Sequence, residues 1–311
     1  MKTRVLTATY FMLALTLGFL SRLLTPYIFD ILIGALAIMG AVEVGRVFER
    51  SRQFNNIYLV GSFTAVLYVG FVFAFTNNWA WQYYLLLVLA LMVAYFAITF
   101  ILTIALKKQT SREMSKYQTN DKIVVYALKK AINTSVIVVY PTLLFATLFI
   151  LNHFNALNRS SVVSSVPFDF YILLTVFFVT IFTDTLAMLV GSAVRGPKLC
   201  PLISPNKTIS GAVGGLIGGV AAAFIIYGLF SINPYFVTAF NNVASLWTVA
   251  IFGVVGSIVS QCGDIFASWL KRRARVKDYG TIFPGHGGVM DRVDGLIFNS
   301  AFMLICILIL F

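Results

Sequence analysis

Charged residues are scarce in this chain. Only 11% of its 311 residues are Asp, Glu, Lys or Arg, against roughly 25% in soluble domains. Together with a hydrophobic content of 59%, this scarcity excludes an ordinary soluble domain. The three cysteines show no paired spacing and no CxxC, so they indicate neither disulfide pairing nor a zinc site. The net charge of +12 could suit nucleic acid, but the basic residues gather in alternate loops, so we expect no nucleic-acid partner.

Long apolar runs dominate the chain instead. A bilayer core of about 30 Å needs about 20 apolar residues in a helix. Nine stretches meet this requirement, at about 5–24, 28–48, 57–76, 80–106, 123–151, 168–191, 211–231, 243–266 and 293–311. The sequence therefore predicts an all-α, polytopic integral membrane protein with about nine transmembrane helices. Pro141 lies inside the fifth stretch, where we expect a kink or break. No cleavable signal peptide is expected, because residues 5–20 lack a small-residue cleavage pattern.

The positions of Lys and Arg predict the orientation in the membrane. With the N-terminus in the cytosol, 21 of the 23 basic residues fall in cytosolic segments, and only Arg22 and Arg159 do not. We therefore expect a cytosolic N-terminus and a C-terminus outside. Loops 191–210 and 267–292 then face the cytosol, where nucleoside triphosphates are found. No internal repeat or separate soluble domain is evident, so we divide the chain into N-terminal spans, 1–151, and a membrane region, 168–311, that carries both loops.

The most informative stretch is residues 268–294, which read SWLKRRARVKDYGTIFPGHGGVMDRVD. A glycine-rich loop lies between a basic cluster and two carboxylates. Glycines let backbone N–H groups approach a ligand, basic side chains neutralise phosphate, and hard carboxylates hold Mg²⁺. Asp291 and Asp294 share a face if they lie on one helical turn. The pattern predicts binding of phosphate and a divalent cation at a membrane surface.

This stretch resembles the CDP-diacylglycerol synthase family, also called phosphatidate cytidylyltransferase. The family pattern runs Ser, Lys-Arg, Lys-Asp, Pro-x-His-Gly-Gly and Asp-Arg-x-Asp, and it is complete here from Ser268 to Asp294. An ordinary basic cytosolic loop would explain the charges in 271–277. It would not explain PGHGG followed by DRVD.

Carboxylates inside the predicted spans are a second feature, because ionisable groups are costly in a membrane. Asp264 has Ser260 four residues before it and Ser268 four after it, so the three share one helical stripe. On its sequence alone, Asp264 is equally consistent with a hydrogen bond between helices. The resemblance favours convergence of Asp264 with Asp291 and Asp294 on a cation. We interpret Glu43, three residues before Arg46, as its structural partner.

Residues 184–215 form a second block that also resembles the family. The matching residues are Asp184, Ala187, Ser204, Pro205, Lys207, Thr208 and Gly211. Ser210 departs from the pattern, since many relatives have Glu there, so no role of that carboxylate is carried over. We expect the glycines of 211–219 to serve helix packing, with the start of that helix facing a phosphate. The resemblance covers roughly 180–300. The first 150 residues resemble the family only as generic membrane spans. We interpret them as the part of the chain that forms a groove for the lipid tails.

The resemblance implies a membrane nucleotidyltransferase that condenses CTP with phosphatidate to CDP-diacylglycerol and pyrophosphate in phospholipid synthesis. Mg²⁺ would bind Asp264, Asp291 and Asp294, and the resemblance allows a second cation. Phosphate contacts are expected from Lys207, Thr208, Ser268, Lys271, Arg272, Lys277, Arg292 and the backbone of Gly287 and Gly288. His286 either contacts phosphate, moves a proton or orders its loop. The alternatives are a CTP-dependent polyprenol kinase, another lipid cytidylyltransferase and, less well supported, a transporter. A homodimer is a prior expectation only.

Overall fold

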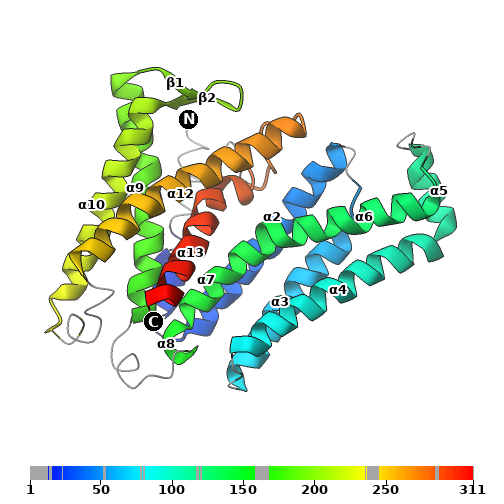
Figure 1. The fold of residues 1–311 in the computed structure, drawn as a ribbon, viewed down its shortest axis with the longest axis horizontal. Coiled ribbons are helices and arrows are strands. Elements are labelled where there is room, and N and C mark those ends of the chain that lie inside the picture. Colours follow the sequence, from blue (N-terminus) through cyan, green and yellow to red (C-terminus); the bar gives the residue numbers. More distant parts are fainter. Residues whose placement is uncertain are drawn as a thin grey trace. The chain divides into compact units, whose positions relative to one another are not determined.

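The computed structural model describes residues 13, 16–22, 24–51, 54–77, 79, 81–116, 119, 121–157, 168–234, 236, 245–283 and 287–310. These residues are almost entirely helical (Figure 1). Within them, eight helices are long and apolar enough to cross a membrane: Pro26–Arg50, Ile57–Thr76, Tyr83–Ala105, Ile123–Asn152, Phe168–Val194, Ile209–Ser231, Leu246–Arg273 and Met290–Leu310. The all-α, polytopic membrane class is confirmed. The predicted span 5–24 lies largely outside the described residues, so the count of nine and the orientation stay predictions.

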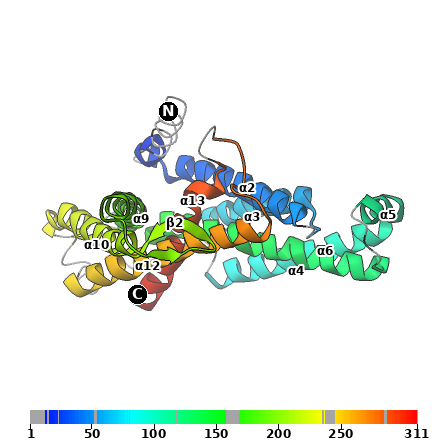
Figure 2. The same cartoon turned by 90° about the horizontal axis from the view of Figure 1, so that it is seen from above.

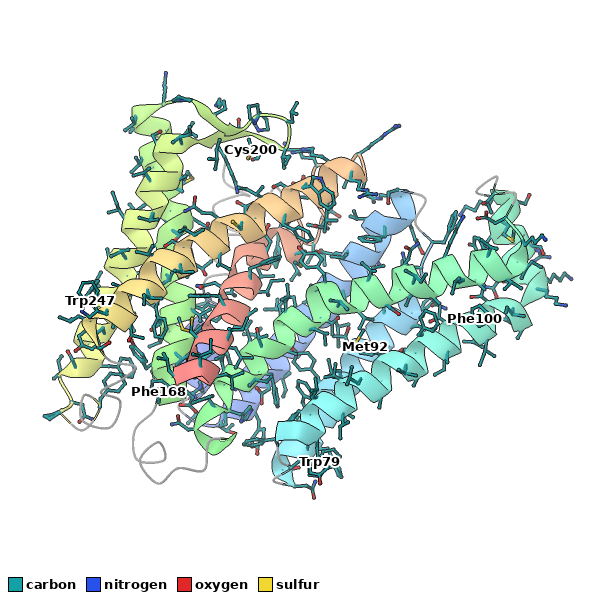
Figure 3. All side chains as sticks on the ribbon, viewed as in Figure 1. Trp79, Met92, Phe100, Phe168, Cys200 and Trp247 are labelled. Atoms are coloured by element: carbon teal, nitrogen blue, oxygen red, sulfur yellow. The ribbon has the colours of Figure 1, made fainter. Side chains whose placement is uncertain are left out.

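Large apolar side chains remain exposed along these helices. Trp247 near the start of α12 (Leu246–Arg273) is 84% exposed and points away from the helices around it (Figure 3). Such surfaces would be unfavourable in water, but lipid tails cover them without cost. The exposed apolar surface therefore agrees with a membrane setting.

The chain folds into two compact units, which divide its membrane helices. The N-terminal unit comprises Met1–Leu143 and Arg273–Met290, and the C-terminal unit comprises Leu144–Arg272 and Asp291–Phe311. Residues 273–290 thus fold with the N-terminal spans although they follow α12 in the sequence.

The N-terminal unit is built from α2 (Pro26–Arg50), α3 (Ile57–Thr76), α4 (Trp81–Ala105), α5 (Lys107–Lys116), α6 (Ile123–Ile137) and η1 (Val138–Leu143). Helix α3 packs against α2 and α4, and α4 also packs against α6 (Figure 1). The expected break at Pro141 is confirmed, because η1 is a π-helical segment in which Tyr140 has non-helical backbone angles (φ −118°, ψ 113°). Proline lacks the N–H that a regular helix would need at this point.

The C-terminal unit contains α7 (Leu144–Asn152), α8 (Phe154–Leu157), α9 (Phe168–Val194), β1 (Lys198–Cys200), β2 (Ser204–Thr208), α10 (Ile209–Ser231), α12 and α13 (Met290–Leu310). Helices α9 and α10 lie side by side along much of their length (Figures 1 and 2). Their approach depends on glycine: a Cβ at Gly218 would come 2.6 Å from the backbone oxygen of Phe182. The predicted packing role of the 211–219 glycines is confirmed.

Polar side chains join the helices of this unit. The Thr183 hydroxyl on α9 donates to Ser257 on α12 at 2.9 Å. The Asn299 amide on α13 donates at 3.1 Å to the Val176 carbonyl and the Thr180 hydroxyl of α9. Bonds of this kind contribute about 0.6–2 kcal/mol each between membrane helices. They fix the spacing of α9, α12 and α13, the helices that carry Asp184, Asp264 and Asp291.

A short antiparallel hairpin connects α9 to α10, which an all-α prediction did not include. Lys198 pairs with Thr208, and Cys200, labelled in Figure 3, pairs with Ser204. The segment contains three prolines within nine residues, in RGPKLCPLISPNK, and each proline disfavours a continuing helix. Pairing of the two short strands satisfies backbone N–H and C=O groups of this connection.

Candidate active site

The ends of several helices in the C-terminal unit surround a pocket of about 860 Å³. Its wall is formed by the last turns of α9, the β1–β2 hairpin, the first turn of α10, the region of α12 around Asp264 and the first turn of α13. A volume of this size lies within the range of small-molecule and cofactor sites, about 300–1,000 Å³.

The pocket is lined by charges of both signs. The carboxylates are those of Asp184, Asp264, Asp291 and Asp294. The cationic side chains are those of Arg195, Lys198, Lys207 and Arg292. The pocket therefore brings together the three predicted metal ligands with three predicted phosphate contacts, Lys207, Thr208 and Arg292. It adds Asp184, whose role the sequence left open, and two basic residues that were not predicted.

Two ion pairs of equal length organise the carboxylates. Lys207 Nζ lies 2.6 Å from Asp264 Oδ2, and Lys271 Nζ lies 2.6 Å from Asp291 Oδ1. The pairs differ in burial: the side chains of Lys207 and Asp264 are 24% and 35% exposed, those of Lys271 and Asp291 only 10% and 4%. The Asp264 pair is therefore partly accessible to solvent, whereas the Asp291 pair is nearly buried.

The predicted helical stripe on α12 is present. The Ser268 hydroxyl donates to Asp264 Oδ1 at 3.4 Å, one helical turn apart. Helix α12 continues to Arg273, so Ser268, Lys271 and Arg272 are helical instead of lying in a loop. Arg272 Nε donates to the carbonyl of Ile203 at 3.1 Å, which attaches α12 to the hairpin.

Helix α13 begins at Met290, three residues before the expected span 293–311, so Asp291 lies in its first turn with Asp294 and not in the expected loop 267–292. The Asp294 carboxylate accepts a hydrogen bond from the backbone N–H of Gly295 at 2.8 Å. A Cβ at Gly263 on α12 would come 2.9 Å from the Asp294 carbonyl. Helices α12 and α13 therefore approach each other closely at Gly263 and Asp294. Asp264 directly follows Gly263 on α12, at the same height along the pair of helices as Asp294.

The N-terminus of α10 also opens onto the pocket. The Thr208 hydroxyl caps the helix by accepting from the Gly211 N–H at 3.1 Å, and Ser210 donates to the same hydroxyl at 3.1 Å. Ser210, the departure from the family pattern, thus supports the cap. The positive end of the helix dipole favours an anion here.

Mg²⁺ was expected on Asp264, Asp291 and Asp294. Carboxylate oxygens are the donors that Mg²⁺ prefers, and all three residues line this one pocket. Within the described part of the chain, no three His, Cys, Asp or Glu side chains are grouped to enclose one ion. The donor set therefore fits Mg²⁺ held by one or two carboxylates and completed by substrate phosphates, the usual protein mode for this ion. Which carboxylates bind it stays a prediction.

Other predicted site residues lie in the N-terminal unit. Lys277 is exposed. Gly287 has a positive φ of 86°, a backbone conformation that favours glycine, and its carbonyl accepts from the Phe283 N–H at 2.9 Å. Gly288 contacts Glu43, where a Cβ would overlap the carboxylate. His286 lies outside the described residues, and its role stays open.

Comparison with known proteins identifies the family. A model of the cytidylyltransferase family matches residues 2–310, nearly the whole chain. This chain belongs to the cytidylyltransferase family. The family match extends over the first 150 residues, which the sequence motifs alone had left as generic spans.

Individual cytidylyltransferases are similar over shorter regions. The phosphatidate cytidylyltransferase of Brucella abortus (strain 9-941) is 42% identical over 150 residues, which cover 48% of this chain and 52% of the relative. That of Staphylococcus haemolyticus is 40% identical over 126 residues, or 40% of this chain and 45% of the relative. That of Rickettsia typhi is 38% identical over 117 residues, or 38% and 50%. The chain thus spans about half the length of the curated relatives it matches.

Proposed function

We propose that this protein condenses CTP with phosphatidate to form CDP-diacylglycerol and pyrophosphate. The observation that carries the proposal is the pocket in the C-terminal unit, where four carboxylates meet four cationic side chains in a chain that matches the cytidylyltransferase family. The names of the similar relatives supply the substrate class. A site at helix ends suits this pair of substrates, because one is water-soluble and the other is anchored in a bilayer.

In the proposed reaction, a phosphate oxygen of phosphatidate attacks the α-phosphorus of CTP. The new bond joins this oxygen to the α-phosphorus, and the bond from the α-phosphorus to the oxygen bridging it to the β-phosphate breaks, releasing pyrophosphate. No covalent enzyme intermediate is needed, because the phosphomonoester is already a nucleophile near neutral pH. The protein must hold two anions in line and neutralise the charge on the leaving group.

The cationic side chains of the pocket suit this task. Arg195, Lys198 and Arg292 line the same cavity as Lys207, and the capped start of α10 adds backbone donors. Lys207 forms an ion pair with Asp264, and both side chains are partly exposed. An incoming phosphate can therefore compete with Asp264 for the Lys207 ammonium group. Each preorganised donor of this kind is worth about 10²–10³ in rate.

Mg²⁺ bound by one or two of Asp264, Asp291 and Asp294 would neutralise substrate phosphates and orient them for attack. Lys271 would keep Asp291 in place, because this nearly buried pair fixes the carboxylate on the wall. Ser268 would orient Asp264 through its hydrogen bond. Asp184 would contribute a further negative charge from α9.

We further propose nine spans with a cytosolic N-terminus, a cytosolic site and a C-terminus outside. The support is the distribution of Lys and Arg, since 21 of 23 then lie on the cytosolic side. A cytosolic pocket would also have direct access to CTP.

A purified-protein assay with labelled CTP, phosphatidate and Mg²⁺ tests the reaction. We expect release of pyrophosphate and a cytidylylated lipid in equal amounts, and loss of both when EDTA removes the cation. Release of CDP with a phosphorylated lipid would instead identify a CTP-dependent kinase. A polyprenol phosphate offered in place of phosphatidate tests the choice of lipid tail.

A further inference from the structure

Glu43 is a buried carboxylate of α2 that the proposed chemistry does not use. The residue is only 1% exposed. The sequence suggested Arg46 as its partner, but Arg46 lies on the exposed side of α2. The Glu43 carboxylate instead accepts hydrogen bonds from the backbone N–H of Val289 at 3.1 Å and of Met290 at 3.0 Å. These bonds connect positions 246 and 247 residues apart in the chain.

The site of these bonds is the beginning of α13. Met290 is the first residue of that helix, and Val289 directly precedes it. The first N–H groups of a helix have no partner within the helix and carry its positive partial charge. A carboxylate from a different helix that accepts two of them acts as an N-cap supplied from elsewhere in the chain.

The surroundings of Glu43 are shaped to admit the carboxylate. A Cβ at Gly280 or at Gly288 would overlap the carboxylate atoms of Glu43. Gly280 shows no positive φ, so space and not backbone conformation is what glycine provides there. Two glycines and two N–H groups therefore form a fitted recess for one side chain.

The residue after Met290 is Asp291, and Asp294 follows within the same turn. Any shift in the start of α13 moves both carboxylates, because a helix transmits displacement along its axis as a nearly rigid body. We infer that Glu43 is a positioning residue for catalysis: it fixes the start of α13 and thereby the placement of Asp291 and Asp294. The effect on catalysis rests on the proposed function. The inference also gives α2, one of the N-terminal spans, a role in positioning the start of α13.

The experiment compares Glu43→Gln with Glu49→Gln. Glu49 is a matched control because it is a carboxylate on the same helix, α2, and lines a separate polar pocket. The amide of Glu43→Gln keeps the size but places an NH₂ group against backbone donors. We expect kcat to fall by about 10²-fold, the effect of a displacement near 1 Å, with the KM for CTP changed by less than about threefold. The half-saturating Mg²⁺ concentration should rise in Glu43→Gln and stay unchanged in Glu49→Gln.

A substrate-free readout accompanies the kinetics. Hydrogen–deuterium exchange of the peptide covering 288–294 should be faster in Glu43→Gln, whereas exchange in α9 and α10 stays as in the wild type. If wild-type protein is active while Glu43→Gln retains its kcat and Mg²⁺ dependence, the positioning role is wrong and the proposed function stands. If wild-type protein lacks cytidylyltransferase activity, the proposed function fails, and unchanged exchange at 288–294 would then reject the capping role separately.

A double-mutant cycle separates positioning from a general loss of folding. Gly280→Ala should lower kcat when Glu43 is present, because the added methyl group displaces the carboxylate. In a Glu43→Ala background the methyl group has room, and Gly280→Ala should change kcat by less than about twofold, as for residues coupled through one contact. Equal effects of Gly280→Ala in both backgrounds would overturn the inference.

Discussion

The two lysine–carboxylate pairs of the pocket allow a prediction that separates stability from catalysis. Both pairs have the same N–O distance of 2.6 Å, but Lys271–Asp291 is nearly buried and Lys207–Asp264 is partly exposed. Changing Asp291 or Asp264 to Asn keeps the size of the side chain and removes its negative charge. If both carboxylates serve the reaction, the two variants should lose similar amounts of turnover and different amounts of stability.

The expected magnitudes follow from burial. Removing one partner of a buried pair leaves an uncompensated charge and costs about 3–5 kcal/mol. A partly exposed pair is screened by solvent and contributes about 0–1 kcal/mol. Asp291→Asn should therefore unfold at a clearly lower temperature in detergent, and Asp264→Asn should unfold close to the wild type. Each should lose about 10²–10³ in kcat, the effect of one electrostatic contribution to a transition state.

Thermal unfolding and steady-state kinetics on the same purified samples measure both quantities. A double variant, Lys271→Met with Asp291→Asn, supplies the control, because removing both charges should recover much of the stability and none of the activity. Near wild-type kcat and half-saturating Mg²⁺ in either single variant would remove that carboxylate from the proposed site. Equal stability losses in Asp291→Asn and Asp264→Asn would refute the assignment of different roles to the two pairs.

Three further predictions concern orientation, packing and the cap of α10. In a cysteine-free background, Asn77→Cys should react with a membrane-impermeant thiol reagent added to intact cells and Ser115→Cys should not; the reverse pattern would invert the proposed orientation. Gly218→Ala should lower the unfolding temperature, because the added methyl group forces α9 and α10 apart at a cost of about 1–3 kcal/mol in the free energy of unfolding. Gly228→Ala is the control and should not lower the unfolding temperature, because a Cβ at Gly228 meets nothing within 4 Å. Ser210→Ala should reduce kcat by less than about tenfold, because the Thr208 cap bond to Gly211 remains; a larger loss would give Ser210 a direct part in the reaction.

The helical parts of the fold could be predicted because their signals are local. Apolar runs of about 20 residues located the spans, and Pro141 marked the break in the fifth of them. The spacing of Asp291 and Asp294 allowed a shared helical turn, and the structure has one, although the helix begins before the expected start at 293. The stripe through Asp264 and Ser268 was correct for the same reason, since positions four apart share a helical face.

The features that the sequence did not predict depend on contacts between distant segments. The β1–β2 hairpin is formed by a proline-rich connection whose strands are only three and five residues long, too short for an alternating pattern. The pairing of Lys207 with Asp264 joins a residue of strand β2 to a residue of helix α12, and such a contact leaves no periodic pattern in the sequence. The contact of Glu43 with the start of α13 spans most of the chain, and the nearer Arg46 was the more obvious partner. Gly280 and Gly288 are the residues in the sequence that could have indicated this contact, because each leaves space for the Glu43 carboxylate.

If the pocket binds phosphates as proposed, the contrast between the two ion pairs accounts for their binding beside four carboxylates. Four carboxylates alone would repel a nucleotide, and four cations alone would hold its products. Asp291 is neutralised by a lysine that sits behind it in the wall, so its charge is balanced before any substrate arrives. Asp264 is paired with Lys207, which itself lines the pocket. Under the proposed function, a phosphate that attracts Lys207 would leave Asp264 able to bind a cation. This exchange would neutralise the phosphate and complete the proposed cation site, and it would couple the binding of CTP to the binding of Mg²⁺.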